Sequence, residues 1–193
     1  GGERKYVEPA KGTVNPRVFI DRLAKKMPAN VTVVADVGQN QIWTCTEYKF
    51  RKEGRLLTSG GMGTMGYSVP AAIGAKMADN SRATVAICGD GAFQMSFMEL
   101  ATAVQFGVDI KVVVMTNNRL GMVRELQTNG YHDRQTAVFL DGSPDFIKLA
   151  EAYGIPAMRV YDDDTMEKGI EMLAEHTGIC LVEVVVDKDM PTL

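Results

Sequence analysis

Hydrophobic positions in this chain form continuous runs separated by longer amphipathic segments. Four runs rich in β-branched residues occupy positions 31–36, 83–88, 110–116 and 181–186, and two weaker runs occupy 55–58 and 157–160. Most of these runs are apolar at successive positions, whereas a strand with one solvated face would alternate apolar and polar residues. They therefore predict strands of a parallel sheet that helices cover on both sides.

The amphipathic segments between the runs carry recognisable helix starts. Asn15 is expected to be an N-cap, with Pro16 at the first helical position. Ser143 and Pro144 repeat this arrangement, and an acidic cluster at 162–164 suits the positive end of a third helix. Together, the runs and helices predict an α/β fold: a doubly wound, mostly parallel sheet of about six strands with helices on both faces.

The length of 193 residues suits a single domain. Because the chain begins with glycine and not methionine, we interpret it as cut from a longer protein. We expect residues 1–14 to be a tether to a missing upstream domain and residues 15–193 to form the folded domain.

Composition excludes several classes of partner. The formal net charge is −3, and the basic residues are scattered among acidic ones, so nucleic acid is not an expected partner. No apolar run approaches the roughly 18 residues that cross a membrane, and the amino terminus has no signal-peptide core. We therefore expect a cytoplasmic protein, in which the three widely spaced cysteines are buried thiols.

Glycine, amide and acidic residues follow the predicted strands, at 38–41, 59–66, 89–93 and 116–122. In an open parallel sheet, ligands bind beyond the carboxyl ends of the strands, so these segments are the candidate site. One interpretation is a dinucleotide site, because 61–66 matches G-x-G-x-x-G and an acidic residue follows about two dozen positions later.

A second interpretation accounts for more residues. Asp90 follows strand 83–88, a helical crossover is expected over 92–107, and Asn117 then follows strand 110–116, so both oxygens are expected at the same sheet edge. Such oxygens suit Mg²⁺, and flanking glycines allow a diphosphate to approach. The alternative is that Asp90 only caps the next helix while Asn117 and its neighbour form a turn.

The GDGAF motif at 89–93 and the asparagine pair that follows it resemble the thiamine diphosphate motif. With the blocks at 37–43, 57–75, 120–123 and 144–155, the chain is similar over about residues 14–187 to the carboxyl-terminal cofactor domain of the acetolactate synthase (acetohydroxyacid synthase) family. The resemblance thus implies that the G-x-G-x-x-G match at 61–66 binds thiamine diphosphate and not a dinucleotide.

The resemblance implies a role for individual residues. The metal ligands would be the side chains of Asp90 and Asn117 and the backbone carbonyl of Arg119. The residues expected around the diphosphate are Gln39, Asn40, Gly89, Gly91, Ala92, Gly121 and Met122, although the family often has histidine where this chain has Asn40. A backbone carbonyl near Gly63 would accept a hydrogen bond from the 4'-amino group of the aminopyrimidine. The Met65 side chain would lie between the two rings of the cofactor.

The implied substrate pocket departs from the family pattern. It would include Val123 and Leu126, and the family commonly has tryptophan at the latter position. We therefore expect only a weak preference for 2-ketobutyrate over pyruvate as acceptor. Segment 127–142 is expected to be mobile and to order over the site, with His132 solvated.

The implied reaction decarboxylates pyruvate and joins the hydroxyethyl unit to a second 2-keto acid, in branched-chain amino acid biosynthesis. No catalytic residue is expected in this chain, because the activating glutamate of the family comes from a missing amino-terminal domain of a neighbouring subunit. The isolated chain is thus expected to be inactive. The parent enzyme is expected to be a homodimer or tetramer, with FAD and a regulatory subunit as options. Another thiamine diphosphate-dependent decarboxylase or carboligase, or a dinucleotide-binding module, remain as alternatives.

Overall fold

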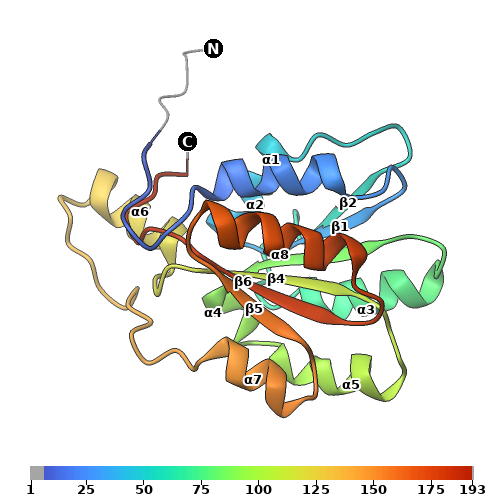
Figure 1. The fold of residues 1–193 in the computed structure, drawn as a ribbon. Helices are drawn as coiled ribbons and strands as arrows, with labels where there is room; N and C mark the ends of the chain where they lie inside the picture. Colours follow the sequence, from blue (N-terminus) through green and yellow to red (C-terminus); the bar gives the residue numbers. More distant parts are fainter. Residues whose placement is uncertain (1–6, 193) are drawn as a thin grey trace.

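The computed structural model describes residues 7–192 of the chain. In this part, six parallel strands form one sheet in the order β2-β1-β3-β4-β6-β5 (Figure 1). The predicted α/β fold is confirmed, and every predicted run forms a strand. The strands are β1 Thr32–Ala35, β2 Arg55–Thr58, β3 Thr84–Gly89, β4 Lys111–Thr116, β5 Ala157–Val160 and β6 Cys180–Val185.

Helices cover both faces of the sheet. One face is covered by α1 Pro16–Lys26, α2 Gln39–Glu47 and α8 Asp163–Glu175, and the other by α3 Ser68–Ala78, α4 Asp90–Phe93, the 3₁₀ helix η1 Phe97–Glu99, α5 Leu100–Gln105 and α7 Phe146–Ala152. Helix α6 Gly121–Gly130 lies at the carboxyl edge of the sheet, beside the C-terminal segment, where Thr192 N donates to the Glu125 carboxylate (Figure 1).

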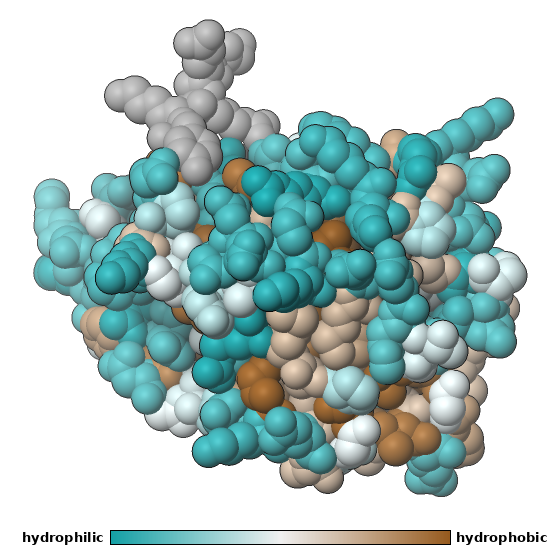
Figure 2. All heavy atoms as spheres, viewed as in Figure 1, coloured by the Kyte–Doolittle hydropathy of each residue, from teal (hydrophilic) through white to brown (hydrophobic). Residues whose placement is uncertain are grey.

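Strand β3 shows why the strands read as continuous apolar runs. Val85 and Ile87 belong to the core beneath α1 and α8, whereas Ala86 and Cys88 belong to the core on the opposite face. Because successive side chains of a strand point to opposite faces, a strand buried on both sides needs apolar residues at every position. Over α1 and α8 the outer surface is mainly hydrophilic (Figure 2).

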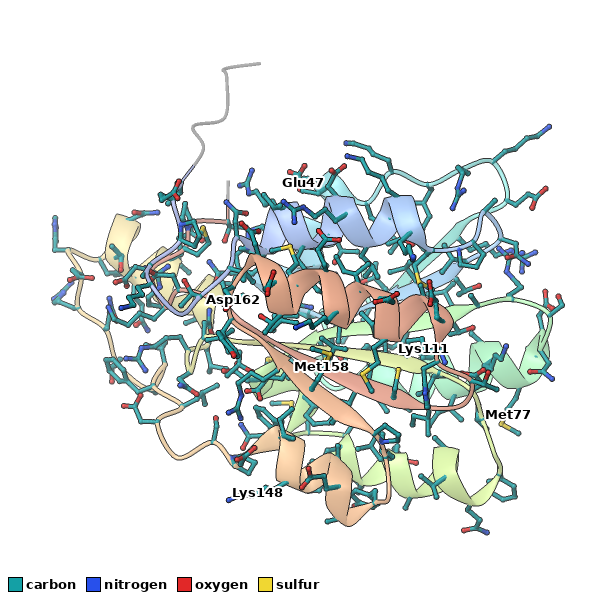
Figure 3. The ribbon with its side chains drawn as sticks, viewed as in Figure 1. Glu47, Met77, Lys111, Lys148, Met158 and Asp162 are labelled. Atoms are coloured by element: carbon teal, nitrogen blue, oxygen red, sulfur yellow. The ribbon has the colours of Figure 1, made fainter. Side chains whose placement is uncertain are left out.

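The helix starts predicted from the sequence are confirmed for α1 and α8 but not for α7. The Asn15 side chain accepts from the backbone of Arg17 at 3.0 Å, as an N-cap does. Asp162, at the amino end of α8 (Figure 3), accepts from Thr165 N at 2.8 Å in a capping box. The prediction for α7 is wrong, because Asp145 and not Ser143 is its N-cap.

The predicted crossover helix over 92–107 is also broken. It is divided into α4, η1 and α5, with Ser96 at φ −143°, outside the helical region. Segment 127–142, expected to be mobile, begins with the last turn of α6, and its mobility stays a prediction.

Two further observations bear on the predictions for the chain as a whole. No helix in residues 7–192 has the length and apolar character needed to cross a membrane. The predicted tether, 1–14, lies partly outside the described residues; within it, Val14 is buried and its N–H donates to Val185 O at 2.9 Å.

Candidate cofactor site

A cavity of about 100 Å³ lies at the carboxyl edge of the sheet. The starts of α2 and α6 and the turn between β3 and α4 form its walls. Among the residues that line it are twelve of the fourteen that the sequence singled out: Gln39, Asn40, Met65, Gly89, Asp90, Gly91, Ala92, Asn117, Arg119, Gly121, Met122 and Val123.

The other two residues lie outside this cavity. Gly63 is exposed in the loop after β2, and Leu126 is exposed over 60% of its surface on α6. His132 is also exposed, in the loop after α6. A volume of 100 Å³ is below the roughly 300 Å³ at which pockets for small molecules begin, so the cavity can enclose one end of a cofactor and not the whole molecule.

Asp90 ties the ends of two neighbouring strands together. Its Oδ2 accepts from the backbone N–H groups of Asn118 at 2.7 Å and Asn117 at 3.2 Å, and its Oδ1 accepts from Gly91 N at 2.9 Å. Asn118 has φ +54°, a conformation that asparagine tolerates better than most residues. The carboxylate therefore bonds the start of α4 and also the turn after β4, which a simple helix cap would not do.

The charge of Asp90 lies in a costly position. The residue is only 2% exposed, and burial raises its pKa to about 6, against the opposing effect of the backbone N–H bonds. Within residues 7–192, no lysine or arginine forms an ion pair with it. The same residues contain no group of three His, Cys, Asp or Glu side chains suited to a metal. A cation here would thus be bound by one carboxylate together with amide and carbonyl oxygens, a donor set that fits Mg²⁺.

Asn117 is held beside this carboxylate by its side-chain amide. Its Nδ2 donates to Gln39 Oε1 at 3.2 Å, and its Oδ1 accepts from Arg119 N at 3.0 Å. These bonds fix which end of the amide is oxygen, and they hold Asn117 and Arg119 in the turn that the Asp90 carboxylate also contacts.

Two helices begin at the cavity without a side-chain cap. Gly38 and Leu120 are the N-caps of α2 and α6, and neither helix has a side-chain hydrogen bond to its first turn. The first N–H groups of a helix have no partner within the helix, and they attract anions. Two such helix ends that converge on one cavity fit a diphosphate.

Close contact between the walls depends on glycine. A Cβ at Gly121 would lie 1.9 Å from Gln39 Oε1, so any side chain there would force the Gln39 amide out of its position. Gly38 has φ +146°, a backbone conformation that L residues rarely adopt. These two glycines let α2 and α6 start close together.

The C-terminal segment holds Gln39 and Trp43, two residues of the cavity lining, which the sequence did not suggest. Gln39 Nε2 donates to Met190 O at 2.9 Å and to Thr192 Oγ1 at 3.0 Å, and it also donates to the Glu125 carboxylate at 3.2 Å. Trp43, for which packing was expected, is buried, and its Nε1 donates to the segment at 3.2 Å. No local motif could have revealed these long-range bonds.

Asp36 is a second residue that the sequence analysis missed. Its carboxylate accepts from Gly66 N at 3.0 Å and Ser68 N at 2.8 Å, so it caps α3 from the end of β1 and anchors the glycine loop. The anchored loop brings Met65 to the cavity, where its Cε would be 3.4 Å from a Cβ at Gly91. An acidic residue at the end of an apolar run was the available signal.

Most of the chain matches one family of known proteins. Residues 36–184 match the family described as thiamine pyrophosphate enzyme, C-terminal TPP binding domain. The chain is 39% identical over 185 residues to the mitochondrial acetolactate synthase catalytic subunit of Aspergillus candidus, covering 94% of this chain and 26% of that protein. The acetolactate synthase large subunit of Lactococcus lactis is 38% identical over 181 residues (94% and 31%), and the large subunit of isozyme 2 of Escherichia coli is 34% identical over 184 residues (95% and 33%). The chain thus spans about a quarter to a third of the length of these relatives.

Proposed function

Because it belongs to the thiamine pyrophosphate enzyme family and carries the C-terminal cofactor-binding domain of that family, we propose that this chain binds the diphosphate end of thiamine diphosphate through Mg²⁺ as part of an acetolactate synthase. One observation carries the proposal: two uncapped helix starts and the buried carboxylate of Asp90 converge on one cavity.

The residues around the cavity divide the binding between them. Asp90, the Asn117 side chain and the Arg119 carbonyl hold Mg²⁺, and the free N–H groups at the starts of α2 and α6 hold the diphosphate. When bound, thiamine diphosphate supplies a nucleophilic carbon that adds to the carbonyl of a 2-keto acid and allows decarboxylation. Met65 supports the cofactor from the glycine loop, which Asp36 keeps against the sheet.

The proposed reaction joins the hydroxyethyl unit of pyruvate to a second 2-keto acid, either pyruvate or 2-ketobutyrate. Its support is that the similar proteins are named acetolactate synthases. Val123 and Leu126 lie on the exposed side of α6 and would face the acceptor. We expect a weak preference for 2-ketobutyrate, which competition between the two acceptors in the full-length enzyme would measure.

The 193-residue chain alone is proposed to be inactive. Gly63 and Met62 of the glycine loop are exposed, so the pyrimidine end of the cofactor would have no second wall in this chain. A missing amino-terminal domain of a neighbouring subunit would supply that wall and the activating glutamate. Acetolactate formation by the purified chain would contradict this. A homodimer or tetramer, FAD, a regulatory subunit and a cytoplasmic location are likewise proposed only for the whole enzyme.

A dinucleotide is disfavoured by the position of Asp36. In that alternative, the pyrophosphate would lie at the start of α3, where the Asp36 carboxylate already accepts from Ser68 N. A fixed negative charge there repels a pyrophosphate. The geometry also fits another thiamine diphosphate-dependent decarboxylase or carboligase, and the names of the similar proteins favour acetolactate synthase over it.

The test uses Trp43, the single tryptophan of the chain, which lines the cavity. Its fluorescence is followed while thiamine diphosphate is added with Mg²⁺, with EDTA in place of Mg²⁺, and with NAD in place of thiamine diphosphate. A saturable change that needs both Mg²⁺ and thiamine diphosphate is expected. A response to NAD, or none to thiamine diphosphate at millimolar concentration, would refute the proposal.

A further inference from the structure

A second cavity, separate from the cofactor site, lies between α6, the loop that follows it and the C-terminal segment. Its volume is about 470 Å³. Three cationic side chains line it, from Arg119, Arg124 and Lys188, together with the carboxylates of Asp133 and Asp189. The proposed function gives none of these side chains a role, because only the backbone of Arg119 takes part in the metal site.

Arg124 is the unusual member of this group. The residue is only 7% exposed, yet its Nε and Nη2 are buried with no hydrogen-bond partner in the described part of the chain. Its Nη1 lies 3.8 Å from Asp189 Oδ1, beyond hydrogen-bonding distance. Nearly all buried polar groups in proteins are hydrogen-bonded, and a buried charged group without a partner is costly.

The two unpartnered atoms form one binding edge. Nε–H and one N–H of Nη2 point in the same direction from the planar guanidinium, and this fork matches the two oxygens of a carboxylate or phosphate. Both atoms are shut off from solvent in this conformation, so an oxyanion could satisfy them only if the side chain turned toward the cavity that Arg124 lines.

The carboxylates around the cavity are already engaged. Asp133 accepts from Thr128 Oγ1 and Gln135 Nε2, both at 2.8 Å, and Asp189 pairs with Lys188. Arg119 pairs with Asp141, which lies outside the cavity lining, and its guanidinium carbon is 4.7 Å from the centre of the Phe139 ring. The cavity thus has more positive than negative groups, and the positive group with no close partner is Arg124.

We propose that this cavity binds a small oxyanion, a carboxylate or phosphate, with Arg124 as its two-pronged donor and Lys188 as a second cation. The anion reaches the fork when the Arg124 side chain turns toward the cavity, away from its loose contact with Asp189. Arg119 lines both this cavity and the cofactor cavity, and Arg124 directly follows Val123 of the cofactor cavity on α6. An anion bound here would thus lie beside the start of the helix that borders the cofactor site. The proposal is independent of the cofactor that the first cavity takes.

Calorimetric titration of the 193-residue chain tests the proposal. The probes are acetate, pyruvate and inorganic phosphate, with the ionic strength held constant by sodium chloride. Saturable binding of at least one probe to one site is expected, and the preferred probe identifies the anion as a carboxylate or a phosphate. If none of the three binds saturably, the proposal is wrong.

Variants separate a built site from general electrostatic attraction. Arg124→Gln should weaken anion binding at least tenfold. Lys188→Gln should weaken it severalfold, and because Lys188 is exposed, this second variant tests the site even if Arg124→Gln folds poorly. Arg55→Gln, which removes the same charge from an exposed position on the edge strand β2, should leave it unchanged. Equal affinities in Arg124→Gln and Arg55→Gln would overturn the proposal.

The role of Asp189 gives the sharpest distinction. If Asp189 competes with the anion for Arg124, Asp189→Asn should strengthen anion binding severalfold. If Asp189 is instead the structural partner of Arg124, the same variant should lower the melting temperature and weaken binding, and that result would also overturn the proposal.

Discussion

Two helices that start at the cofactor cavity, α2 and α6, differ from three that start elsewhere, α1, α7 and α8. The first turns of α1, α7 and α8 are capped by the side chains of Asn15, Asp145 and Asp162. The first turns of α2 and α6, which line the cavity, have no such cap. All five helices face the same requirement, because the first N–H groups of any helix lack partners within it.

The difference shows where the chain forgoes stability for binding. A good N-cap contributes about 1 kcal/mol, so two open helix starts leave about 2 kcal/mol unused in the free chain. An anion that accepts from both can recover that energy on binding. Helix α3 is intermediate, since its start is capped by Asp36 from another strand, which anchors the glycine loop and closes that helix end to anions.

Asp90→Asn should have the largest effect on the cavity side of this comparison. The change removes the buried carboxylate that lines the cavity, and the loss of one member of a buried charge pair costs about 3–5 kcal/mol. The affinity for thiamine diphosphate in the presence of Mg²⁺ should therefore fall by a factor of about 100 or more, measured by Trp43 fluorescence.

The matched change on the capped side is Asp162→Asn. It makes the same substitution at a helix start away from the cavity, and asparagine also caps, so cofactor affinity should stay within twofold of the original. If Asp90→Asn retains Mg²⁺-dependent binding as well as Asp162→Asn does, Asp90 is not a metal ligand.

Gly121→Ala should have the next largest effect. The new Cβ would lie 1.9 Å from Gln39 Oε1, so the Gln39 side chain would have to move and would lose its bonds to Met190 O and Thr192 Oγ1. Overpacking of this kind costs about 1–3 kcal/mol of stability. We expect that loss in urea unfolding, together with a fall of about tenfold or more in cofactor affinity.

Gly130→Ala, in the same helix, is the control. No atom lies within 4 Å of its added Cβ, so stability should be unchanged or slightly higher and cofactor affinity unaffected. If both variants lose stability and cofactor affinity equally, any added methyl group in α6 is harmful. The close contact between Gly121 and Gln39 would then not be the cause of the effect of Gly121→Ala.

Much of the fold was predictable because its signals are local. Each apolar run became a strand, since burial on both faces of a parallel sheet requires apolar residues at successive positions. The prediction of a single helix over 92–107 was wrong, because composition alone does not show that Ser96 leaves the helical conformation. For α7, Ser143 and Asp145 are both good caps two positions apart, and the sequence does not decide between them.

The site was predictable where topology carries the argument. Asp90 and Asn117 follow adjacent parallel strands, so their proximity could be deduced from strand order. The bonds from Gln39 to Met190 and Thr192 join residues about 150 positions apart, and no pattern in the sequence marks them. The ligand roles of these residues remain predictions.

Leu120→Asp and Leu120→Asn would close the open start of α6, with a smaller expected effect. Both side chains can cap the first turn, but only aspartate adds a negative charge beside the diphosphate. Cofactor affinity should fall in both variants, and about tenfold further in Leu120→Asp, because like charges repel. Equal affinities for the two variants would show that charge at this helix start has little influence on binding.

Asp162→Ala should have the smallest effect, and it tests the capped side of the comparison. The Asp162 side chain accepts from Thr165 N, and this exposed cap is far along the chain from any residue that lines the cavity. Its loss should lower the free energy of unfolding by about 1 kcal/mol, which corresponds to about 2–4 °C in melting temperature. Cofactor affinity should be unchanged, with Asp162→Asn as the variant that restores the cap. A clear loss of affinity in Asp162→Ala would mean that capped and open helix starts are not separate in function, because the stability of α8 would then contribute to the cofactor site.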